Sequence, residues 1–175
     1  MSDVVLNKMT EIKLALVTGA SRGIGKGIAE DLIARGYKVV GTATSESGCE
    51  SLKKDLQALG DEHDAFVLNI SDSEQVKAAI ADFLTAHGTP YVVVNNAGIT
   101  RDNLFMRMKD DEWLDVINTN LSGVYRVCKS LMKPVIKSSE GLIINISSFI
   151  GTGNAGQVNY SAAKAALECL TRSLD

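Results

Sequence analysis

The fold of the chain is most strongly constrained by an apolar run that is followed directly by three glycines. Residues 14–17 read Leu-Ala-Leu-Val, which is typical of a strand buried on both faces of a parallel sheet. Gly19, Gly23 and Gly25 follow, and a helical pattern then opens. A glycine turn between a strand and a helix lets a pyrophosphate approach the backbone, where the helix N-terminus presents N–H groups and a positive dipole end. Glycine triplets also occur in ordinary tight turns, so this motif alone leaves both interpretations open.

Length and composition describe one globular domain. The chain has 175 residues, of which 45% are hydrophobic and 22% are charged, and a chain of this length buries a substantial core. The formal net charge of −3 argues against nucleic acid or an anionic membrane as the main partner. We therefore expect a single domain over residues 1–175.

Cysteine usage and the lack of targeting signals favour the cytoplasm. Cys49, Cys128 and Cys169 are odd in number and widely spaced, which predicts reduced thiols and no metal site. Residues 1–11 mix charged and apolar side chains and show no signal-peptide core. No apolar run approaches the length of a membrane span. The expected location is therefore cytoplasmic.

Apolar runs alternate with helical patterns along the chain. Such an alternation predicts a doubly wound α/β sheet of parallel strands between two helical layers, a three-layer α/β/α fold. No repeat, low-complexity tract or linker interrupts the pattern. The expected strands are residues 14–17, 38–42, 65–69, 91–95 and 142–147, and the expected helices are residues 24–35, 47–59, 71–86, 110–135 and 159–174.

Small and polar residues follow each expected strand. In a doubly wound sheet the ligand crevice lies beyond the carboxyl ends of the strands, where the winding direction reverses. We therefore predict a ligand site at this edge, because packing alone does not explain why each strand ends in such residues. The residues concerned are 19–22, 42–45, Asn69, Ile70, 95–98, Ser147 and Ser148.

The end of the second expected strand indicates which dinucleotide the crevice accepts. An NAD site carries an Asp or Glu about 20 residues past the glycines, where it binds the ribose 2′-hydroxyl. Here residues 41–45 read Gly-Thr-Ala-Thr-Ser, and the first carboxylate is Glu46. The hydroxyl of Thr44 can donate to a 2′-phosphate, and Arg22 offers a forked cation for it, a solvated turn residue being the alternative for Arg22. Together these features favour NADP(H) over NAD(H).

Tyr160 and Lys164 form a candidate catalytic pair. Their spacing places both side chains on one face of a helix. A free phenol has a pKa near 10, and an ammonium about 5 Å away stabilises the phenolate by roughly 3 kcal/mol at an effective dielectric constant near 20. We expect Lys164 to lower the pKa of Tyr160 by about two units, into the range of a useful acid. Such a pair is common by chance and needs support from other residues.

Two further places in the sequence supply that support. Ser147 or Ser148 arrives beside the pair at the end of the fifth expected strand and could hydrogen-bond a substrate carbonyl. Asn118 and Asn120 lie within an otherwise helical run, although asparagine disfavours helix interiors. These asparagines predict a local irregularity with a purpose.

Taken together, these motifs resemble those of the short-chain dehydrogenase/reductase family. The resemblance spans nearly the whole chain and implies a Rossmann-like fold. Within the family, residues 41–46 and 95–108 look most similar to the 3-oxoacyl-acyl-carrier-protein reductases of fatty-acid synthesis. The motifs are Thr-Gly-Ala-Ser-Arg-Gly-Ile-Gly at 18–25, Asn-Asn-Ala-Gly at 95–98, Asn120, Ser147-Ser148, and Tyr-Ser-Ala-Ala-Lys at 160–164.

The resemblance implies a role for each candidate residue. Tyr160 would be the proton donor, and Lys164 would hold the nicotinamide ribose and lower the pKa of Tyr160. Ser147 or Ser148 would orient the carbonyl, and Asn120 would hold a water of the proton relay. The implied cofactor is NADP(H). The implied cofactor-binding residues are Gly19, Ser21, Arg22, Gly23, Ile24, Gly25, Thr44, Asn69, Ile70, Asn96, Ala97, Gly98, Tyr160 and Lys164.

The sequence departs from the family pattern in three places. The family continues through two more strands and a substrate-covering segment beyond Asp175, so we expect a domain that is incomplete at the C-terminus. The segment 147–160 is one residue shorter than usual, which leaves open whether Ser147 or Ser148 is the catalytic serine. Residues 137–140 read Lys-Ser-Ser-Glu where such reductases often carry basic residues that dock the acidic carrier protein. Recognition of the acyl carrier protein is therefore expected to be weaker.

The resemblance implies NADPH-dependent reduction of 3-oxoacyl-acyl-carrier-protein to the 3-hydroxyacyl form, impaired by the missing part. One alternative is reduction of acetoacetyl-CoA or another small ketone by the same residues. Another is an inactive truncated paralogue that acts as a binding or oligomerising module. Without a sixth strand, residues 142–146 would form an apolar sheet edge, and the last helix is rich in small residues, so we expect a homodimer or homotetramer. Neither nucleic acid, a membrane nor a metal is expected as a partner.

Overall fold

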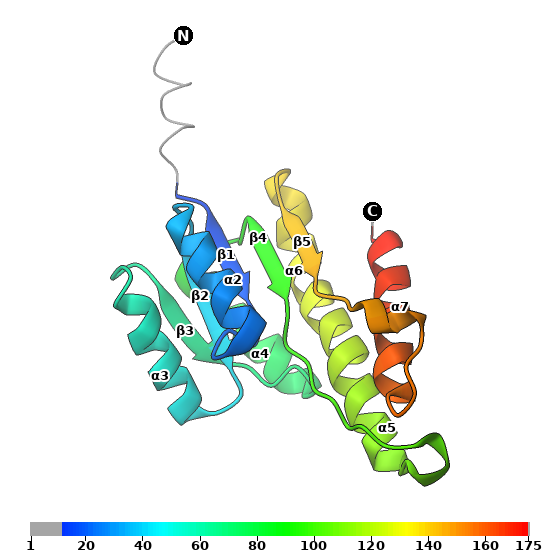
Figure 1. Ribbon diagram of the computed structural model, residues 1–175. Helices are drawn as coiled ribbons and strands as arrows, with labels where there is room; N and C mark the ends of the chain where they lie inside the picture. The colour runs from blue at the N-terminus through cyan, green and yellow to red at the C-terminus, as the bar shows by residue number, and fades with distance from the viewer. Residues whose placement is uncertain (1–11, 175) are drawn as a thin grey trace.

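The computed structural model describes residues 12–174 and contains a sheet of five parallel strands (Figure 1). The strand order is β3-β2-β1-β4-β5. This arrangement confirms the predicted doubly wound α/β sheet. The prediction that residues 1–11 hold no signal peptide lies outside the described part of the chain. The strands are β1 (Leu14–Val17), β2 (Lys38–Ala43), β3 (Asp64–Val67), β4 (Val92–Asn95) and β5 (Leu142–Asn145).

The direction of winding reverses between β1 and β4. From β1 the chain passes outward to β2 and β3, and then crosses back to place β4 and β5 on the other side of β1. Leu16 at the centre of β1 is aligned with Val40 of β2 and with Val93 of β4. The loops that leave β1 and β4 therefore diverge around one crevice, which is the usual ligand position in such a sheet.

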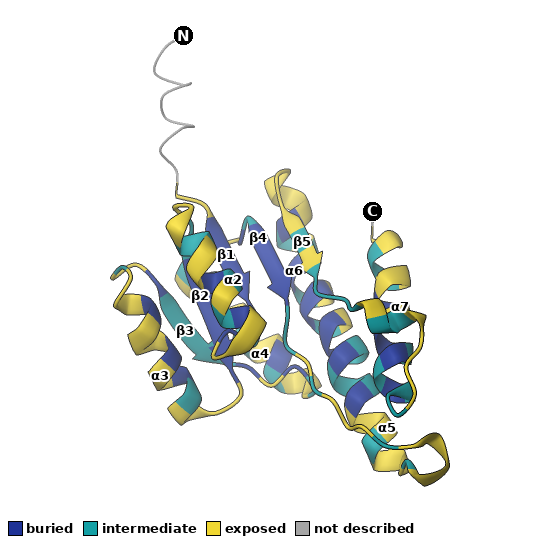
Figure 2. Cartoon of the chain, viewed as in Figure 1, coloured by how far each residue is buried: buried dark blue, intermediate teal, exposed yellow. Residues whose placement is uncertain are grey.

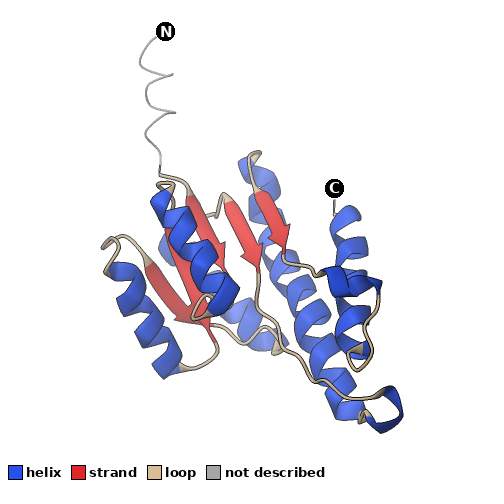
Figure 3. Cartoon of the chain, in the orientation of Figure 1, coloured by secondary structure: helices blue, strands red, loops and turns tan. Residues whose placement is uncertain are grey.

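Helices cover both faces of this sheet (Figure 3). Helices α2 and α3 pack on one face, α4 and α6 pack on the other, and α7 lies beside α6. The longer helices are α2 (Gly23–Ala34), α3 (Glu46–Gln57), α4 (Ser73–His87), α5 (Asp110–Ile117), α6 (Val124–Ser138) and α7 (Val158–Arg172). The short segments are the 3-10 turns η1 (Phe105–Arg107) and η3 (Phe149–Thr152) and the π-helix η2 (Asn118–Gly123).

The residues of β1 alternate between two hydrophobic cores. Leu14 and Leu16 pack with α4 and α6, whereas Ala15 and Val17 pack with α2 and α3. All four side chains are buried, and full burial of a leucine or valine contributes about 1.5–3 kcal/mol. Figure 2 shows this buried interior along β1, β2 and β4. β1 is thus held from both faces, and it fixes the start of the glycine turn.

The structure corrects several predicted boundaries. The expected helix over 110–135 is divided by the π-helix η2 into α5 and α6. The third and fifth strands end at Val67 and Asn145, earlier than expected, because the chain leaves the sheet there and continues into the loops at the crevice. The sequence pattern does not predict η1 and η3, since a single turn is too short to show a hydrophobic period.

β5 is less buried than its composition predicts. Its apolar sequence suits a strand covered on both faces, yet Leu142 is 50% exposed and Ile144 is 39% exposed. Ile143 packs on the side of α6 and α7, so the exposed side chains lie on the opposite face. Within residues 12–174, β5 pairs with β4 alone. One face and one edge of this strand are therefore accessible.

The cysteines are free thiols, with Cys49 and Cys128 buried and Cys169 exposed. The described residues contain no group of three or more His, Cys, Asp and Glu side chains that could hold a metal ion. Among the helices of residues 12–174, none combines the length and the apolar character needed to cross a bilayer.

Candidate cofactor cleft and active site

Thr18 joins the ends of the two central strands. Its side chain is 1% exposed, and its hydroxyl donates to the carbonyl of Val94 at 3.3 Å. The same oxygen accepts the N–H groups of Asn96 at 3.0 Å and Ala97 at 3.1 Å. These bonds hold the loop after β4 directly beside the glycine turn. The sequence gives little signal for this role, because a threonine at a strand end is ordinary.

Gly19 and Gly25 allow the glycine turn to close. Gly19 has a φ of +65°, a left-handed value that favours glycine, and a Cβ there would lie 2.9 Å from Cα of Ala97. A Cβ on Gly25 would strike the carbonyl oxygen of Gly19 and Nδ2 of Asn96. Only glycine suits both positions, and the bare backbone leaves room for a phosphate to approach.

The first turn of α2 has the properties of a phosphate site. Its N-cap, Arg22, makes no side-chain cap hydrogen bond, and the turn contains no acidic residue. The first N–H groups of a helix have no intrahelical acceptor and carry the positive end of the helix dipole. They can therefore bind the pyrophosphate of a dinucleotide. Arg22 itself is exposed at the mouth of the turn.

The predicted cofactor residues of the first four strands surround a single cavity. The cavity has a volume of about 730 Å³ and extends from the start of α2, past the ends of β2 and β3, to the loop after β4. This volume lies in the range of small-molecule and cofactor sites. The predicted residues that line it are Gly19, Ser21, Arg22, Gly23, Ile24, Gly25, Thr44, Asn69, Ile70, Asn96, Ala97 and Gly98.

A second cavity, of about 510 Å³, contains the candidate catalytic pair. Tyr160 and Lys164 line it together with Ser147 and Ser148. The two cavities meet at the glycine turn and the loop after β4, so they form one cleft that reaches from α2 to α7. The residues that line both are Arg22, Ile24, Asn96, Gly98 and Ile99.

The electrostatics of the catalytic pair differ from the prediction. Lys164 is 5% exposed, and its Nζ donates to the carbonyl of Ile146 and lies 5.6 Å from the ring centroid of Tyr160. Burial lowers the pKa of Lys164. Burial also raises the pKa of Tyr160, and the nearby carboxylate of Asp102 raises it further. The predicted lowering of the Tyr160 pKa is therefore wrong for this structure, because the Lys164 ammonium is bound to the backbone and burial of the phenol dominates.

Ser147 and Ser148 both lie in the cleft but are bonded differently. The hydroxyl of Ser147 donates to Oε1 of Glu168 on α7 at 2.9 Å. Oγ of Ser148 accepts the N–H of Ile150 at 3.3 Å and so begins η3. The hydroxyl of Ser147 also lies 3.4 Å from the carbonyl oxygen of Lys164, so its proton has two acceptors, whereas the hydroxyl of Ser148 donates to no acceptor among the described residues.

Asn120 holds the backbone of Ile99, a residue of the cleft wall, through two hydrogen bonds. Its residue is fully buried, and its Oδ1 accepts the N–H of Ile99 while its Nδ2 donates to the carbonyl of Ile99, both at 2.8 Å. Asn120 is not among the described residues that line either cavity, but Ile99 lines both. It sits in the π-helix η2, which confirms the predicted local irregularity. The water-binding role implied by the resemblance stays a prediction.

Two polar residues near the catalytic pair were not among the predicted site residues. Oδ2 of Asp102 accepts a hydrogen bond from Nε2 of Gln157 at 2.9 Å. Asn159, which directly precedes Tyr160, is fully buried. The only sequence signal for Asn159 is its position, a polar residue adjacent to a candidate catalytic side chain at the start of a helix.

The parallel sheet, the glycine turn and the Tyr–Lys pair in one cleft define a nucleotide-binding α/β protein. A sequence profile described as short chain dehydrogenase matches residues 13–175. The chain belongs to the short-chain dehydrogenase family, as its motifs indicate.

Similar proteins cover nearly all of this chain. The 3-oxoacyl-acyl-carrier-protein reductase FabG of Pseudomonas aeruginosa is 55% identical over 163 residues, which are 93% of this chain and 66% of that protein. The FabG protein of Salmonella typhimurium is 53% identical over 165 residues, 94% of this chain and 66% of the relative. The crystal structure of a short-chain dehydrogenase from Streptomyces avermitilis matches with a TM-score of 0.87 and 38% identity, over 94% of this chain and 60% of that one. The chain thus spans 66% of the length of these curated relatives.

Proposed function

We propose that this chain carries the cofactor and catalytic sites of an NADPH-dependent reductase that converts 3-oxoacyl thioesters to 3-hydroxyacyl thioesters in fatty-acid synthesis. The observation that carries the proposal is the continuous cleft, in which the glycine turn of α2 and the pair Tyr160–Lys164 share lining residues. Relatives named as 3-oxoacyl-acyl-carrier-protein reductases support the substrate class.

The residues at the end of β2 fit NADPH better than NADH. Thr44 and Ser45 are exposed there and line the larger cavity. Among the described residues that line this cavity there is no Asp or Glu, whose charge would repel a 2′-phosphate. Hydroxyl groups and the forked guanidinium of Arg22 can donate to that phosphate instead.

Tyr160 acts in this proposal as the proton donor. NADPH, when bound, supplies the hydride that reduces the carbonyl carbon, and Tyr160 donates its phenol proton to the carbonyl oxygen. The phenol is protonated at neutral pH, because its ordinary pKa is already near 10 and burial, followed by Asp102, raises that pKa further. Lys164 is held by the carbonyl of Ile146 close to the phenol. Its ammonium can bind the ribose hydroxyls and stabilise the phenolate left after proton transfer.

Ser148 is the better candidate for orienting the substrate carbonyl. A carbonyl oxygen needs a donor, and the hydroxyl proton of Ser147 already goes to Glu168. Ser148 accepts from the backbone at Ile150, so its own proton remains available. We expect Ser148→Ala to lower kcat more than Ser147→Ala.

The test measures NADPH oxidation with different carbonyl compounds. The assay uses two proteins. One is this chain alone, and the other is this chain fused to the part of the Pseudomonas aeruginosa relative that lies outside the match. The proposal expects turnover of a 3-oxoacyl-acyl-carrier-protein and of acetoacetyl-CoA by the fusion, with little turnover of a ketone that lacks a thioester. Equal turnover of that plain ketone would favour the small-ketone alternative. A fusion that binds NADPH but reduces none of them would favour a binding module.

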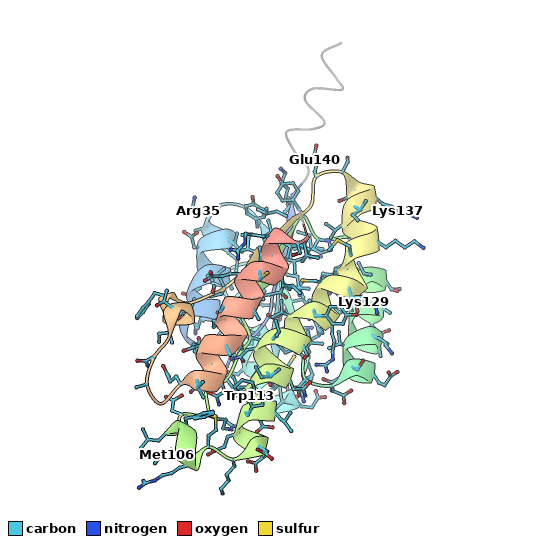
Figure 4. The ribbon with its side chains drawn as sticks, turned by 90° about the vertical axis from the view of Figure 1, so that its right-hand side faces the viewer. Arg35, Met106, Trp113, Lys129, Lys137 and Glu140 are labelled. Atoms are coloured by element: carbon cyan, nitrogen blue, oxygen red, sulfur yellow. The ribbon has the colours of Figure 1, made fainter. Side chains whose placement is uncertain are left out.

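We further propose that the chain self-associates as a homodimer or homotetramer. Leu142 and Ile144 are exposed on one face of β5, whose far edge pairs with no strand of residues 12–174, and an unpaired apolar strand pairs readily with another chain. Figure 4 shows α6 and α7 side by side on one surface, with Lys129 and Lys137 projecting from α6. Ala165 and Cys169 are exposed on α7, and such small side chains allow close contact between helices.

A further inference from the structure

Asn159 uses its whole side chain to connect three backbone segments. Its Nδ2 donates to the carbonyl of Arg101 at 2.9 Å and to the carbonyl of Glu112 at 3.1 Å. Its Oδ1 accepts the N–H of Tyr160 at 2.8 Å. The residue is fully buried, so these bonds form where water does not compete for them. A buried amide with all three bonds made holds one fixed orientation.

The bond to Tyr160 satisfies a group that the helix itself leaves unpaired. α7 begins at Val158, and Gln157, its N-cap, makes no side-chain cap hydrogen bond. The first backbone bond across this start runs from the N–H of Ser161 to the carbonyl of Gln157 at 2.8 Å. The N–H of Tyr160 lies one residue earlier and lacks an acceptor within the helix. Asn159 therefore fixes the backbone from which the Tyr160 phenol extends.

The partner segment is the loop after β4, which also forms the cleft. Besides the bond from Asn159 to Arg101, the N–H of Asn103 donates to the carbonyl of Gly156 at 2.9 Å. Nε2 of Gln157 donates to Asp102 at 2.9 Å, but this pair is exposed to solvent. Asn159 is the fully buried member of this connection. The loop that lines the cofactor cleft and the helix that carries Tyr160 are thereby joined beside the phenol.

We propose that Asn159 is a positioning residue that holds the Tyr160 phenol against the cleft by bonding the start of α7 to the loop after β4. This inference rests on the proposed role of Tyr160 as proton donor. It differs from a purely structural role, in which Asn159 would only stabilise the fold. The charged groups that face the phenol are Asp102 on the loop and Lys164 on α7. The hydrogen bonds of Asn159 control the position of Tyr160 relative to these two groups.

The test replaces Asn159 and follows Tyr160 directly. In Asn159→Ala the loop loosens, so Asp102 moves away and water reaches the phenol, and both changes lower the pKa of Tyr160 from its raised value. NMR of ring-labelled tyrosine reports this titration, with the Tyr160→Phe spectrum identifying the signal. In the fusion described above we expect kcat to fall by about 10²-fold, the cost of a 1 Å misplacement. The Kd for NADPH should change far less than kcat, because Thr18 still holds the cofactor-lining residues Asn96 and Ala97.

Two matched variants sharpen the result. Ser161 lies on the other side of Tyr160 and is buried, and its hydroxyl has no hydrogen-bond partner among the described residues. Ser161→Ala should therefore leave both the titration and kcat unchanged. Asn159→Asp keeps an oxygen for the Tyr160 N–H but offers no N–H to the carbonyls of Arg101 and Glu112. Its kcat should fall as in Asn159→Ala, whereas the added carboxylate beside Tyr160 raises the pKa of the phenol, so the titration is read in Asn159→Ala.

A third variant covers the case in which Asn159→Ala does not fold. Asn103→Ala removes the bonds from Nδ2 to Glu112 and Arg107, both 3.1 Å, and loosens the same loop without a hole in the interior. It should shift the Tyr160 titration in the same direction. An unchanged Tyr160 titration in folded Asn159→Ala, or in Asn103→Ala when Asn159→Ala does not fold, overturns the inference. Absence of turnover in the unmodified fusion would instead refute the proposed function, and the titration would still decide the role of Asn159.

Discussion

Gly25 lies so close to Gly19 that no methyl group fits between them. A Cβ on Gly25 would strike the carbonyl oxygen of Gly19 and Nδ2 of Asn96, which donates to that carbonyl at 3.1 Å. This contact joins the start of α2 to the end of β1 and shapes the turn that a phosphate would approach. Gly27, one turn into the same helix, offers a contrast, because a Cβ there would meet nothing within 4 Å.

We expect Gly25→Ala to abolish the thermal stabilisation of the protein by NADPH. The added methyl group must push the glycine turn away from Asn96, and this displacement distorts the phosphate site. The same displacement should also lower the melting temperature of the protein without ligand. In the unsubstituted protein, NADPH at a hundredfold excess over its Kd should stabilise by about 2.7 kcal/mol. Gly27→Ala is the control, and its better helix propensity should stabilise α2 by up to about 1 kcal/mol while NADPH binding is kept. Normal NADPH binding by Gly25→Ala would contradict the claim that the glycine turn binds the phosphate of the cofactor.

Arg22→Ala should narrow the preference for NADPH over NADH. The guanidinium is exposed at the mouth of the glycine turn and lines both cavities, where it can pair with the 2′-phosphate that NADH lacks. The shift in melting temperature with each cofactor measures the preference. NADPH should lose most of its advantage, and the response to NADH should change little. If the unsubstituted protein responds equally to both cofactors, the assignment to NADPH is wrong.

Asp102→Asn should move the titration of Tyr160 to lower pH. Burial is the larger cause of the raised pKa and is unchanged, but the carboxylate contribution is removed. Since the fold favours the protonated phenol, this contribution to stability is complete below the ordinary tyrosine pKa of about 10 and is lost as the pH rises through the folded value. Tyrosine NMR and alkaline unfolding both report the change. A titration that stays in place would show that Asp102 does not act on the phenol.

Local patterns predicted the sheet because its strands are short, apolar and punctuated by turns. The strand at residues 14–17 was correct to the residue, since buried β-structure of this kind reads directly from an apolar run next to glycine. The π-helix at Asn118–Gly123 was predicted only as an irregularity. Its type depends on the side chain of Asn120 bonding to Ile99, a contact distant in sequence.

The membership of the candidate site was more predictable than its electrostatics. Each predicted cofactor residue before β5 lines the larger cavity, because the carboxyl ends of parallel strands meet at one edge. The pKa of Tyr160 was predicted in the wrong direction from helical spacing alone. Spacing places Lys164 on the same face, but it gives neither the burial of the phenol nor the carbonyl of Ile146 that binds the ammonium.

Self-association should depend on the free edge of β5. Ile144 is 39% exposed on this strand, and Ile144→Lys places a charge where a second chain would pair. Light scattering at micromolar concentration should show dimers, tetramers or larger species for the unsubstituted chain and a smaller mass for the variant. Thr152→Lys, at an exposed position in η3 outside the sheet, is the control and should keep the larger mass. A monomer before substitution would contradict the proposal.

The most direct test of the account is carbonyl reduction by Tyr160→Phe. In the fusion that supports turnover, loss of the phenol hydroxyl should slow NADPH oxidation with acetoacetyl-CoA by about 10²–10⁴-fold, the usual contribution of a general acid. The Kd for NADPH should stay the same, because the hydroxyl matters only when a proton moves. Lys164→Ala is the comparison, and it should weaken both turnover and NADPH binding. Unchanged turnover in Tyr160→Phe, with NADPH still bound, would contradict the central claim.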